Sequence, residues 1–253
     1  MKVVKVGGKI LEDEASLLQL LDNFAALEGP KVLVHGGGRL ATKIGDKLGI
    51  ESKYVDGRRI TDEETLQVVT MVYGGLANKT VVAQLQARDC NALGLTGADM
   101  NVILAEKRPV KSIDYGYVGD IKEVDAQRLA TLINADIVPV MAPLTHDKQG
   151  HMLNTNADTI AAETAKGLCA HFEVSLVYCF EKPGVLEQES DDTSVIPHID
   201  SKSYKELKAK NIIHSGMIPK LDNAFEALNA GVKEVIITNI QNINTGLGTR
   251  ISL

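Results

Sequence analysis

The stretch that decides the fold is Val32-Leu33-Val34-His35-Gly36-Gly37-Gly38-Arg39. Its aliphatic start predicts a buried strand, and the three glycines that follow predict a tight turn. A helix is predicted directly after the glycines. Free backbone N–H groups at a glycine turn and at a helix N-terminus attract anions, so this strand–turn–helix unit predicts an anion site.

Short aliphatic runs alternate with helical patterns along the rest of the 253-residue chain. Buried strands are predicted at residues 3–6, 32–34, 137–140, 174–177 and 235–237. Amphipathic helices are predicted at residues 14–27, 61–73, 77–88, 125–132, 203–210 and 220–230. This alternation predicts an α/β protein with an open, mostly parallel sheet between helix layers. Two regions depart from this alternation of strands and helices. Residues 100–123 are predicted to form a small β-hairpin excursion, and residues 181–200 an acidic surface loop.

Composition excludes several classes of protein. The net charge of −6, without a run of basic residues, argues against a nucleic-acid partner. Three cysteines without a C-x-x-C pair predict neither a disulfide framework nor a zinc site, and the six histidines show no metal-ligand spacing. No signal-like apolar stretch and no segment of membrane-spanning length is present. We therefore expect a cytoplasmic protein with no membrane partner and no metal ligands of its own.

The first predicted strand carries a charge and ends in glycine. Lys5 lies in an otherwise apolar run, where an unpaired ammonium group would be costly, so an anion is expected nearby. Gly7 and Gly8 would let backbone N–H groups approach a ligand without side chains in the way. The alternative is an edge-strand lysine whose ammonium group reaches water.

Three short polar side chains alternate along residues 152–158, namely Asn154, Asn156 and Asp158. In an extended segment they would lie on one side and converge on one point. Asp158 is also predicted to cap the helix at residues 159–168. Ordinary Asx-turn and capping chemistry explains Asp158 and part of Asn156, but it leaves Asn154 unexplained.

Two more segments carry isolated cations. Arg58 and Arg59 are adjacent after a glycine, so their side chains point in different directions, and we expect one to be functional and one to face solvent. A guanidinium fork suits bidentate capture of a carboxylate, and two surface arginines are the alternative. Further on, Pro219 and Lys220 are predicted in the first turn of a helix. A cation there is unfavourable unless an anion binds close by.

One competing reading of the glycine turn is a dinucleotide site. Residues 36–41 satisfy G-x-G-x-x-A, and Asp56 lies twenty residues after Gly36. Residues 51–55, however, are short and polar, unlike the buried strand that presents a ribose-binding acid. This reading also leaves Lys5 and Lys220 without a role. The chain contains no P-loop, no protein-kinase signature and no G-x-S-x-G elbow.

The combination of these segments resembles the amino acid kinase family, in its acylglutamate branch, over essentially the whole chain. The resemblance is carried in order by Lys5-Val-Gly-Gly, Val34-His-Gly-Gly-Gly, Gly57-Arg-Arg-Ile-Thr, Leu153-Asn-Thr-Asn-Ala-Asp, Gly216-Met-Ile-Pro-Lys220 and the closing Gly246-Leu-Gly-Thr-Arg250. It implies ATP- and Mg²⁺-dependent phosphorylation of the side-chain carboxylate of an N-acyl-L-glutamate, with N-acetyl-L-glutamate expected first. That reaction would be a step of arginine biosynthesis, and the resemblance further implies a homodimer.

By matching position, the resemblance assigns catalytic roles to Lys5, Lys220 and Asp158. The two lysines would neutralise charge on the transferring phosphoryl group, and Asp158 would hold their ammonium groups in place. Gly8 would donate a backbone N–H to phosphate. Glu181 would contact the nucleotide together with Lys220, although the family often has Asp where this chain has Glu181.

The resemblance assigns substrate binding to a second set of residues. Gly36 and Gly37 would donate backbone N–H groups, Arg59 and Asn154 would bind the α-carboxylate and amide of the acyl amino acid, and Asn156 would lie close by. Residues 1–168 would then form the acylglutamate-binding lobe and residues 169–253 the nucleotide-binding lobe of one continuous domain.

Several alternatives remain open on sequence alone. A kinase of the same fold with another substrate, such as N-succinylglutamate or carbamate, is one. A non-catalytic ligand-binding relative is the second, and a dinucleotide-dependent oxidoreductase is the third.

Overall fold

A computed structural model describes residues 1–55, 57–213 and 217–253; Asp56 and the first three residues of the 214–220 motif lie outside the described residues. The strands are β1 (Lys2–Val6), β2 (Lys31–His35), β3 (Tyr54–Val55), β4 (Arg58–Arg59), β5 (Ala92–Leu95), β6 (Ile103–Lys107), β7 (Gly119–Val124), β8 (Val138–Met141), β9 (Leu144–His146), β10 (Met152–Asn154), β11 (Ser175–Phe180), β12 (His198–Ile199), β13 (Glu234–Asn239) and β14 (Thr249–Ile251). The α-helices are α1 (Glu14–Ala25), α2 (Gly38–Lys47), α3 (Glu63–Val69), α4 (Asn78–Gln86), α5 (Ala126–Asn134), α6 (Ala157–Leu168), α7 (Ser201–Ala209) and α8 (Ile218–Asn229). Shorter helical segments are η1 (Thr70–Ala77), η2 (Asp99–Asn101) and η3 (Ile240–Asn242).

Eight strands form the main sheet in the order β12-β14-β13-β11-β1-β2-β8-β5. In the described part of this sheet, the pairs from β13 to β5 and the pair β12–β14 are parallel, whereas β13 and β14 pair antiparallel. The prediction of a mostly parallel sheet is therefore confirmed. Strand β1 lies between β11 and β2, with Lys5 opposite Tyr178 and Val34. Lys5 is thus in a central strand, and the edge-strand alternative is wrong.

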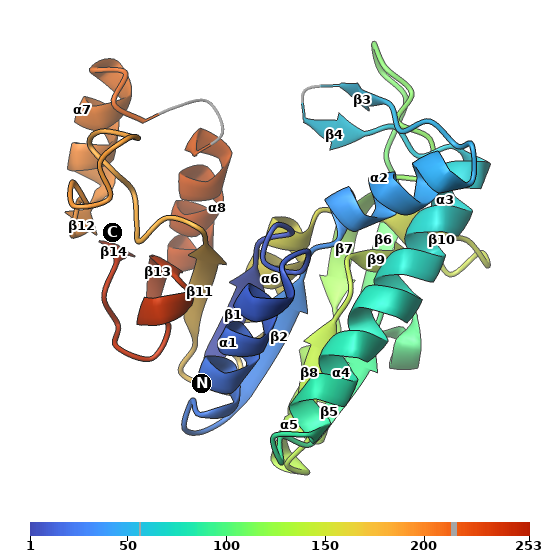
Figure 1. Ribbon diagram of the computed structural model, residues 1–253, viewed down its shortest axis with the longest axis horizontal. Helices are drawn as coiled ribbons and strands as arrows, with labels where there is room; N and C mark the ends of the chain where they lie inside the picture. The colour runs from blue at the N-terminus through green and yellow to red at the C-terminus, as the bar shows by residue number, and fades with distance from the viewer. Residues whose placement is uncertain (56, 214–216) are drawn as a thin grey trace.

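Helices cover both faces of this sheet (Figure 1). Val3 packs with side chains of α5, α6 and α8 on one face, whereas its neighbour Val4 packs with side chains of α1 and α4 on the other. Because both faces are covered, the central strands are continuous apolar runs, and both valines are fully buried. No helix within the described ranges is both long and apolar enough to cross a membrane.

A second, four-stranded sheet of order β10-β9-β6-β7 lies beside the main one (Figure 1). The hairpin predicted at residues 100–123 is present as the antiparallel pair β6 and β7. It is larger than predicted, because β9 adds to β6 in parallel and β10 to β9 antiparallel. The loop at residues 181–200 is also less irregular than expected, since it contains a bridge between Leu186 and Val195 and the whole of β12.

The two helices predicted at residues 61–73 and 77–88 join into one run. Helix α3 is capped by the side chain of Asp62, which accepts a hydrogen bond from Thr65 N. The run then passes through the π-helical segment η1 into α4. Such π-helical segments are frequent at functional sites. Here η1 places Tyr73 against the glycine turn after β2.

Candidate active site

Two neighbouring cavities open at the carboxyl ends of β1 and β2 and share the turn Gly36–Gly38. The smaller, of about 230 Å³, lies between this turn, β4, β7 and the start of α6. The larger, of about 880 Å³, lies between the same turn, Gly7–Gly8 and the segments after β11. Ligands of open α/β sheets bind at this edge, outside the carboxyl ends of the strands.

The two glycine turns approach each other closely between the cavities. A Cβ atom added at Gly36 would lie 3.3 Å from the backbone nitrogen of Gly8. A Cβ atom added at Gly37 would lie only 2.8 Å from the ring of Tyr73, and the backbone φ of Gly37 is +158°. A side chain at Gly37 would therefore collide with Tyr73, and one at Gly36 would press on the backbone of Gly8. The close approach gathers backbone N–H groups where an anion can bind.

Lys5 and Lys220 meet at one carboxylate, that of Asp158. The Nζ–Oδ distances are 2.7 Å for Lys5 and 3.6 Å for Lys220. Burial opposes ionisation of Asp158, but the charges of Lys5 and Lys220 outweigh it and hold the pKa of the carboxyl below its ordinary value. Both ammonium groups also lie over the ring of Phe180, at 4.7 and 5.0 Å from its centroid. One carboxylate thus holds two cations at the wall of the larger cavity.

Asn156, not Asp158, caps helix α6. Its side-chain oxygen accepts hydrogen bonds from the backbone nitrogens of Asp158 at 2.8 Å and Thr159 at 3.1 Å. The extended segment ends at Asn154, so the prediction that three side chains converge from one strand face is wrong. Because Asn156 satisfies the first N–H groups of the helix, the carboxylate of Asp158 is free to meet the lysines.

Arg59 is 7% exposed and lies at the wall of the smaller cavity. Its Nη2 donates to Gly38 O at 2.6 Å and to Thr42 Oγ1 at 2.9 Å, and its Nη1 donates to Ser52 Oγ. The guanidinium group stacks over Tyr54, 4.8 Å from the ring centroid. Among the residues that the structure describes, no carboxylate pairs with Arg59, which leaves a buried positive charge for an anionic ligand.

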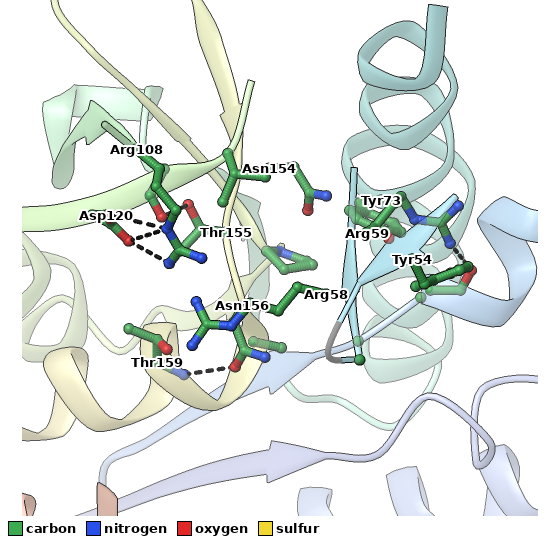
Figure 2. A pocket seen from close by; sticks show the side chains of 18 residues that line it. Tyr54, Arg58, Arg59, Tyr73, Arg108, Asp120, Asn154, Thr155, Asn156 and Thr159 are labelled. Atoms are coloured by element: carbon green, nitrogen blue, oxygen red, sulfur yellow. Dashed lines mark hydrogen bonds and ion pairs between the residues drawn. The ribbon is translucent and has the colours of Figure 1, made fainter. Parts of the chain in front are cut away.

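Asn154 faces the same cavity from β10 (Figure 2). Its side-chain nitrogen donates to Thr61 Oγ1 at 2.9 Å. Its backbone nitrogen donates to Tyr117 O at 2.8 Å, which ties β10 to the loop before β7. Asn154 is therefore held from both sides, and its amide oxygen has no partner among the described residues and could accept from a ligand.

Sequence reasoning missed a buried support behind the glycine turn. Nδ1 of His35 lies 2.7 Å from Gly36 O and therefore donates, so Nε2 is the acceptor for the side-chain amide of Asn78 at 3.0 Å. Asn78 also donates to Val140 O in β8. Complete burial lowers the pKa of His35 to about 4, which keeps the ring neutral. No local signal marks this pair, because the two residues come from separate elements.

Each predicted site residue has a definite place. The smaller cavity is lined by Gly36, Gly37, Arg59, Asn154 and Asn156. The larger is lined by Lys5, Gly8, Glu181 and Lys220 together with the shared glycines. Asp158 lines neither but pairs with both lysines. Oε1 of Glu181 lies 3.6 Å from Nζ of Lys9, and both of these half-exposed side chains line the larger cavity.

Over the residues that the structure describes, the strand that a dinucleotide site requires is not found next to the glycine turn. Residues Tyr54–Val55 form β3, which pairs with β4 in a two-stranded sheet separate from the main one. A ribose-binding acid in a dinucleotide fold follows a strand of the main parallel sheet, next to the glycine turn. In the main sheet that neighbouring place beside β2 is taken by β8.

This fold and this pair of cavities define an amino acid kinase. The model of the amino acid kinase family matches residues 1–239, and the chain belongs to that family. It is 67% identical over 251 residues to the acetylglutamate kinase of Bacteroides thetaiotaomicron, covering 99% of this chain and 98% of that one. It is 66% identical to the acetylglutamate kinase of Parabacteroides distasonis, with 98% of each chain covered. Among solved structures, smu.665 from Streptococcus mutans superposes with a TM-score of 0.82 at 27% identity, covering 99% and 98% of the two chains.

Proposed function

We propose that the chain catalyses ATP-dependent phosphorylation of the side-chain carboxylate of an N-acyl-L-glutamate. N-acetyl-L-glutamate is the first substrate to test, because the relatives at 64–67% identity carry the name acetylglutamate kinase. The observation that carries the proposal is the meeting of the two cavities at Gly36–Gly38 and Gly8, beside two lysines held by one carboxylate. This is the arrangement that two anionic substrates need at the point where they react.

In the proposed reaction a γ-carboxylate oxygen attacks the terminal phosphorus of ATP. The new O–P bond forms as the bond to the bridging oxygen breaks, and that electron pair leaves with ADP. A carboxylate is already ionised at neutral pH, so no proton has to be removed. Catalysis then consists of positioning and charge stabilisation, which is what phosphoryl transfer requires.

The residues of the larger cavity suit the nucleotide side of this reaction. Lys5 and Lys220 would stabilise charge on the phosphoryl group, with Asp158 holding both ammonium groups in position. Gly8 would offer its backbone N–H, and Glu181, which lines the same cavity, would lie near the nucleotide. Mg²⁺ would enter bound to the phosphates of ATP, and when bound it neutralises their charge.

The residues of the smaller cavity suit the acylglutamate. The buried guanidinium of Arg59 would bind the α-carboxylate, and Asn154 would bind the acyl amide. Gly36 and Gly37 would direct N–H groups toward the reacting carboxylate, and Asn156 lines the cavity at the start of α6.

The segments that line each cavity support the proposed division into two lobes. All residues around the smaller cavity fall between Gly36 and Thr159, within the proposed acylglutamate lobe of residues 1–168. The larger cavity adds residues from Phe180 to Ile237, within the proposed nucleotide lobe of residues 169–253. The reacting groups would meet between the lobes.

A homodimer is part of the proposal. Three large apolar side chains, Met71, Leu76 and Leu93, are 55%, 50% and 38% exposed on η1 and on β5. Strand β5 is the last strand of the main sheet, and an edge strand offers unpaired backbone groups to a second copy. Sedimentation at micromolar concentration is expected to give a dimer, and Leu76→Glu with Leu93→Glu a monomer. A monomeric wild-type protein would contradict this assignment.

The function is tested by ADP release from Mg-ATP with N-acetyl-L-glutamate, free L-glutamate or no acceptor. Hydroxylamine traps the acyl phosphate product as a hydroxamate. We expect hydroxamate and ADP in equal amounts with the acylated substrate and background with free glutamate. ADP release without hydroxamate, or turnover of free glutamate alone, would refute the proposed reaction.

A further inference from the structure

The smaller cavity carries more positive charge than an N-acetyl-L-glutamate can use. Three arginines line it, Arg58, Arg59 and Arg108, and Asp120 is the one acidic side chain among its described lining residues. The substrate of the proposed reaction has two carboxylates, and the γ-carboxylate must face the phosphoryl group beside Lys5 and Lys220. One carboxylate is left for the arginines.

Arg58 and Arg59 point to separate places in the smaller cavity. They are neighbours in β4, and neighbouring side chains of a strand point to opposite faces. Figure 2 shows Arg59 extending toward Tyr54 and Arg58 extending the other way, toward Asn156 at the start of α6. A single carboxylate therefore cannot occupy both. In the proposed reaction the α-carboxylate would pair with Arg59, which is buried and already held by Gly38 and Thr42.

Arg58 has no partner of its own within the described parts of the chain. It makes no hydrogen bond, ion pair or ring contact there, and its side chain is exposed in the cavity. It lines the smaller cavity and is not among the residues around the larger one, so a role toward the nucleotide does not account for it. The expectation that one of the two adjacent arginines faces solvent agrees with the exposed side chain of Arg58, which in addition lines the smaller cavity.

Arg108 adds a second cation on the same side. Asp120 accepts from its Nε at 3.1 Å and from its Nη2 at 2.5 Å. This pair holds the guanidinium group in place from β7 and leaves Nη1 without a partner among the described residues. Figure 2 shows the Arg108–Asp120 pair on the same side of the cavity as Arg58 and Asn156. A carboxylate there would meet one fully available guanidinium and one that is already positioned.

We propose that this subsite binds a carboxylate at the far end of the acyl group, so that the preferred substrates are half-amides of a dicarboxylic acid with L-glutamate. The inference rests on the proposed phosphorylation of an N-acylglutamate. With an acetyl group, the methyl would lie beside the guanidinium group of Arg58. It would remove water from this cation without pairing its charge. A terminal carboxylate instead forms charge-assisted hydrogen bonds with it.

The test compares kcat/KM for N-acetyl-, N-malonyl-, N-succinyl- and N-glutaryl-L-glutamate, and for N-succinamoyl-L-glutamate, whose terminal amide removes only the charge. We expect at least one dicarboxylic half-amide to exceed N-acetyl-L-glutamate by roughly 10- to 100-fold, the scale of a charge-assisted hydrogen bond. The uncharged succinamoyl analogue should fall to the acetyl level. Chain length among the three diacids reports how far the subsite lies from the amide.

The variant Arg58→Leu provides a second test of the proposed subsite. It should reduce the preference for the charged acyl group over acetyl by roughly 10-fold or more, and Arg58→Lys should restore part of that preference. Lys111→Leu is the matched control, because Lys111 is an exposed cation between β6 and β7 outside the cavity. Its preference ratio should equal that of the wild type.

The outcomes separate this inference from the function on which it rests. Turnover of N-acetyl-L-glutamate with no gain from a terminal carboxylate would overturn the acyl-carboxylate subsite and leave the kinase assignment standing. An equal effect of Arg58→Leu on all acyl substrates would do the same. Absence of hydroxamate with every acylglutamate would overturn both.

Discussion

Lys5 in the central strand β1 and Asp158 in the first turn of α6 form an ion pair with an Nζ–Oδ1 distance of 2.7 Å. The two side chains are only 8% and 14% exposed. The pair ties the end of the central strand to the helix that leads into the second half of the chain. It also orients Lys220, which approaches the same carboxylate from α8 at 3.6 Å.

Removal of one member of this buried pair is expected to destabilise the protein. Lys5→Met leaves Asp158 with Lys220 alone, and breaking a buried pair costs about 3–5 kcal/mol of unfolding free energy. Urea denaturation at pH 7 measures this loss. Lys9→Met, which removes a half-exposed lysine from its contact with Glu181, should change stability by about 1 kcal/mol or less. Equal losses of unfolding free energy in the two variants would show that the buried Lys5–Asp158 pair stabilises the fold no more than the exposed Lys9–Glu181 contact.

Lys220→Ala is expected to lower kcat by roughly 10²–10³, the scale for losing one preorganised charge stabiliser. The fold should survive, because Lys220 is 26% exposed and Asp158 keeps Lys5. Steady-state ADP release with saturating Mg-ATP and N-acetyl-L-glutamate gives the value. Lys202→Ala, at an exposed position in α7, is the control. Near-normal turnover of Lys220→Ala would remove this lysine from the mechanism.

Arg59 is expected to act on one substrate only. Arg59→Lys keeps the charge but loses the planar fork, so KM for the acylglutamate should rise roughly 10-fold or more while KM for ATP stays within about twofold. The two KM values are measured by varying each substrate at saturation of the other. A parallel rise in both would mean that Arg59 supports the fold through Gly38 and Thr42 and does not bind the α-carboxylate.

His35 predicts a pH dependence of stability. Its folded-state pKa is lowered to about 4 by burial, whereas an exposed histidine titrates near 6.5. Between these values the unfolded chain binds the proton and the folded chain does not, so unfolding free energy rises with pH. The full contribution, about 3 kcal/mol, is present above pH 6.5 and is lost as the pH falls to about 4.

Urea titrations at several pH values between 4 and 7 test this dependence in wild type and in His35→Gln. The variant loses bonds to Gly36 and Asn78 and should be less stable at pH 7, but its stability should change less across this range. Parallel curves for the two proteins would assign the slope to other groups.

Local sequence signals determined much of the sheet and of the turns that surround the candidate site. The glycine turns after β1 and β2 and the first-turn position of Lys220 are all where short-range patterns place them. These features depend on neighbours along the chain, because a turn needs a permissive backbone and a first turn needs capped N–H groups. The parallel sheet followed in the same way from alternating apolar strands and amphipathic helices.

Tertiary structure decided the features that join distant segments. Asn156 took the cap that Asp158 was expected to provide, and Asp158 turned to lysines from β1 and α8. Strands β9 and β10 enlarged a predicted hairpin into a sheet. No sequence pattern joined His35 to Asn78 or placed Arg58 in a cavity. Pairing of charges and strands depends on which surfaces meet on folding, and the single chain carries no local record of that choice.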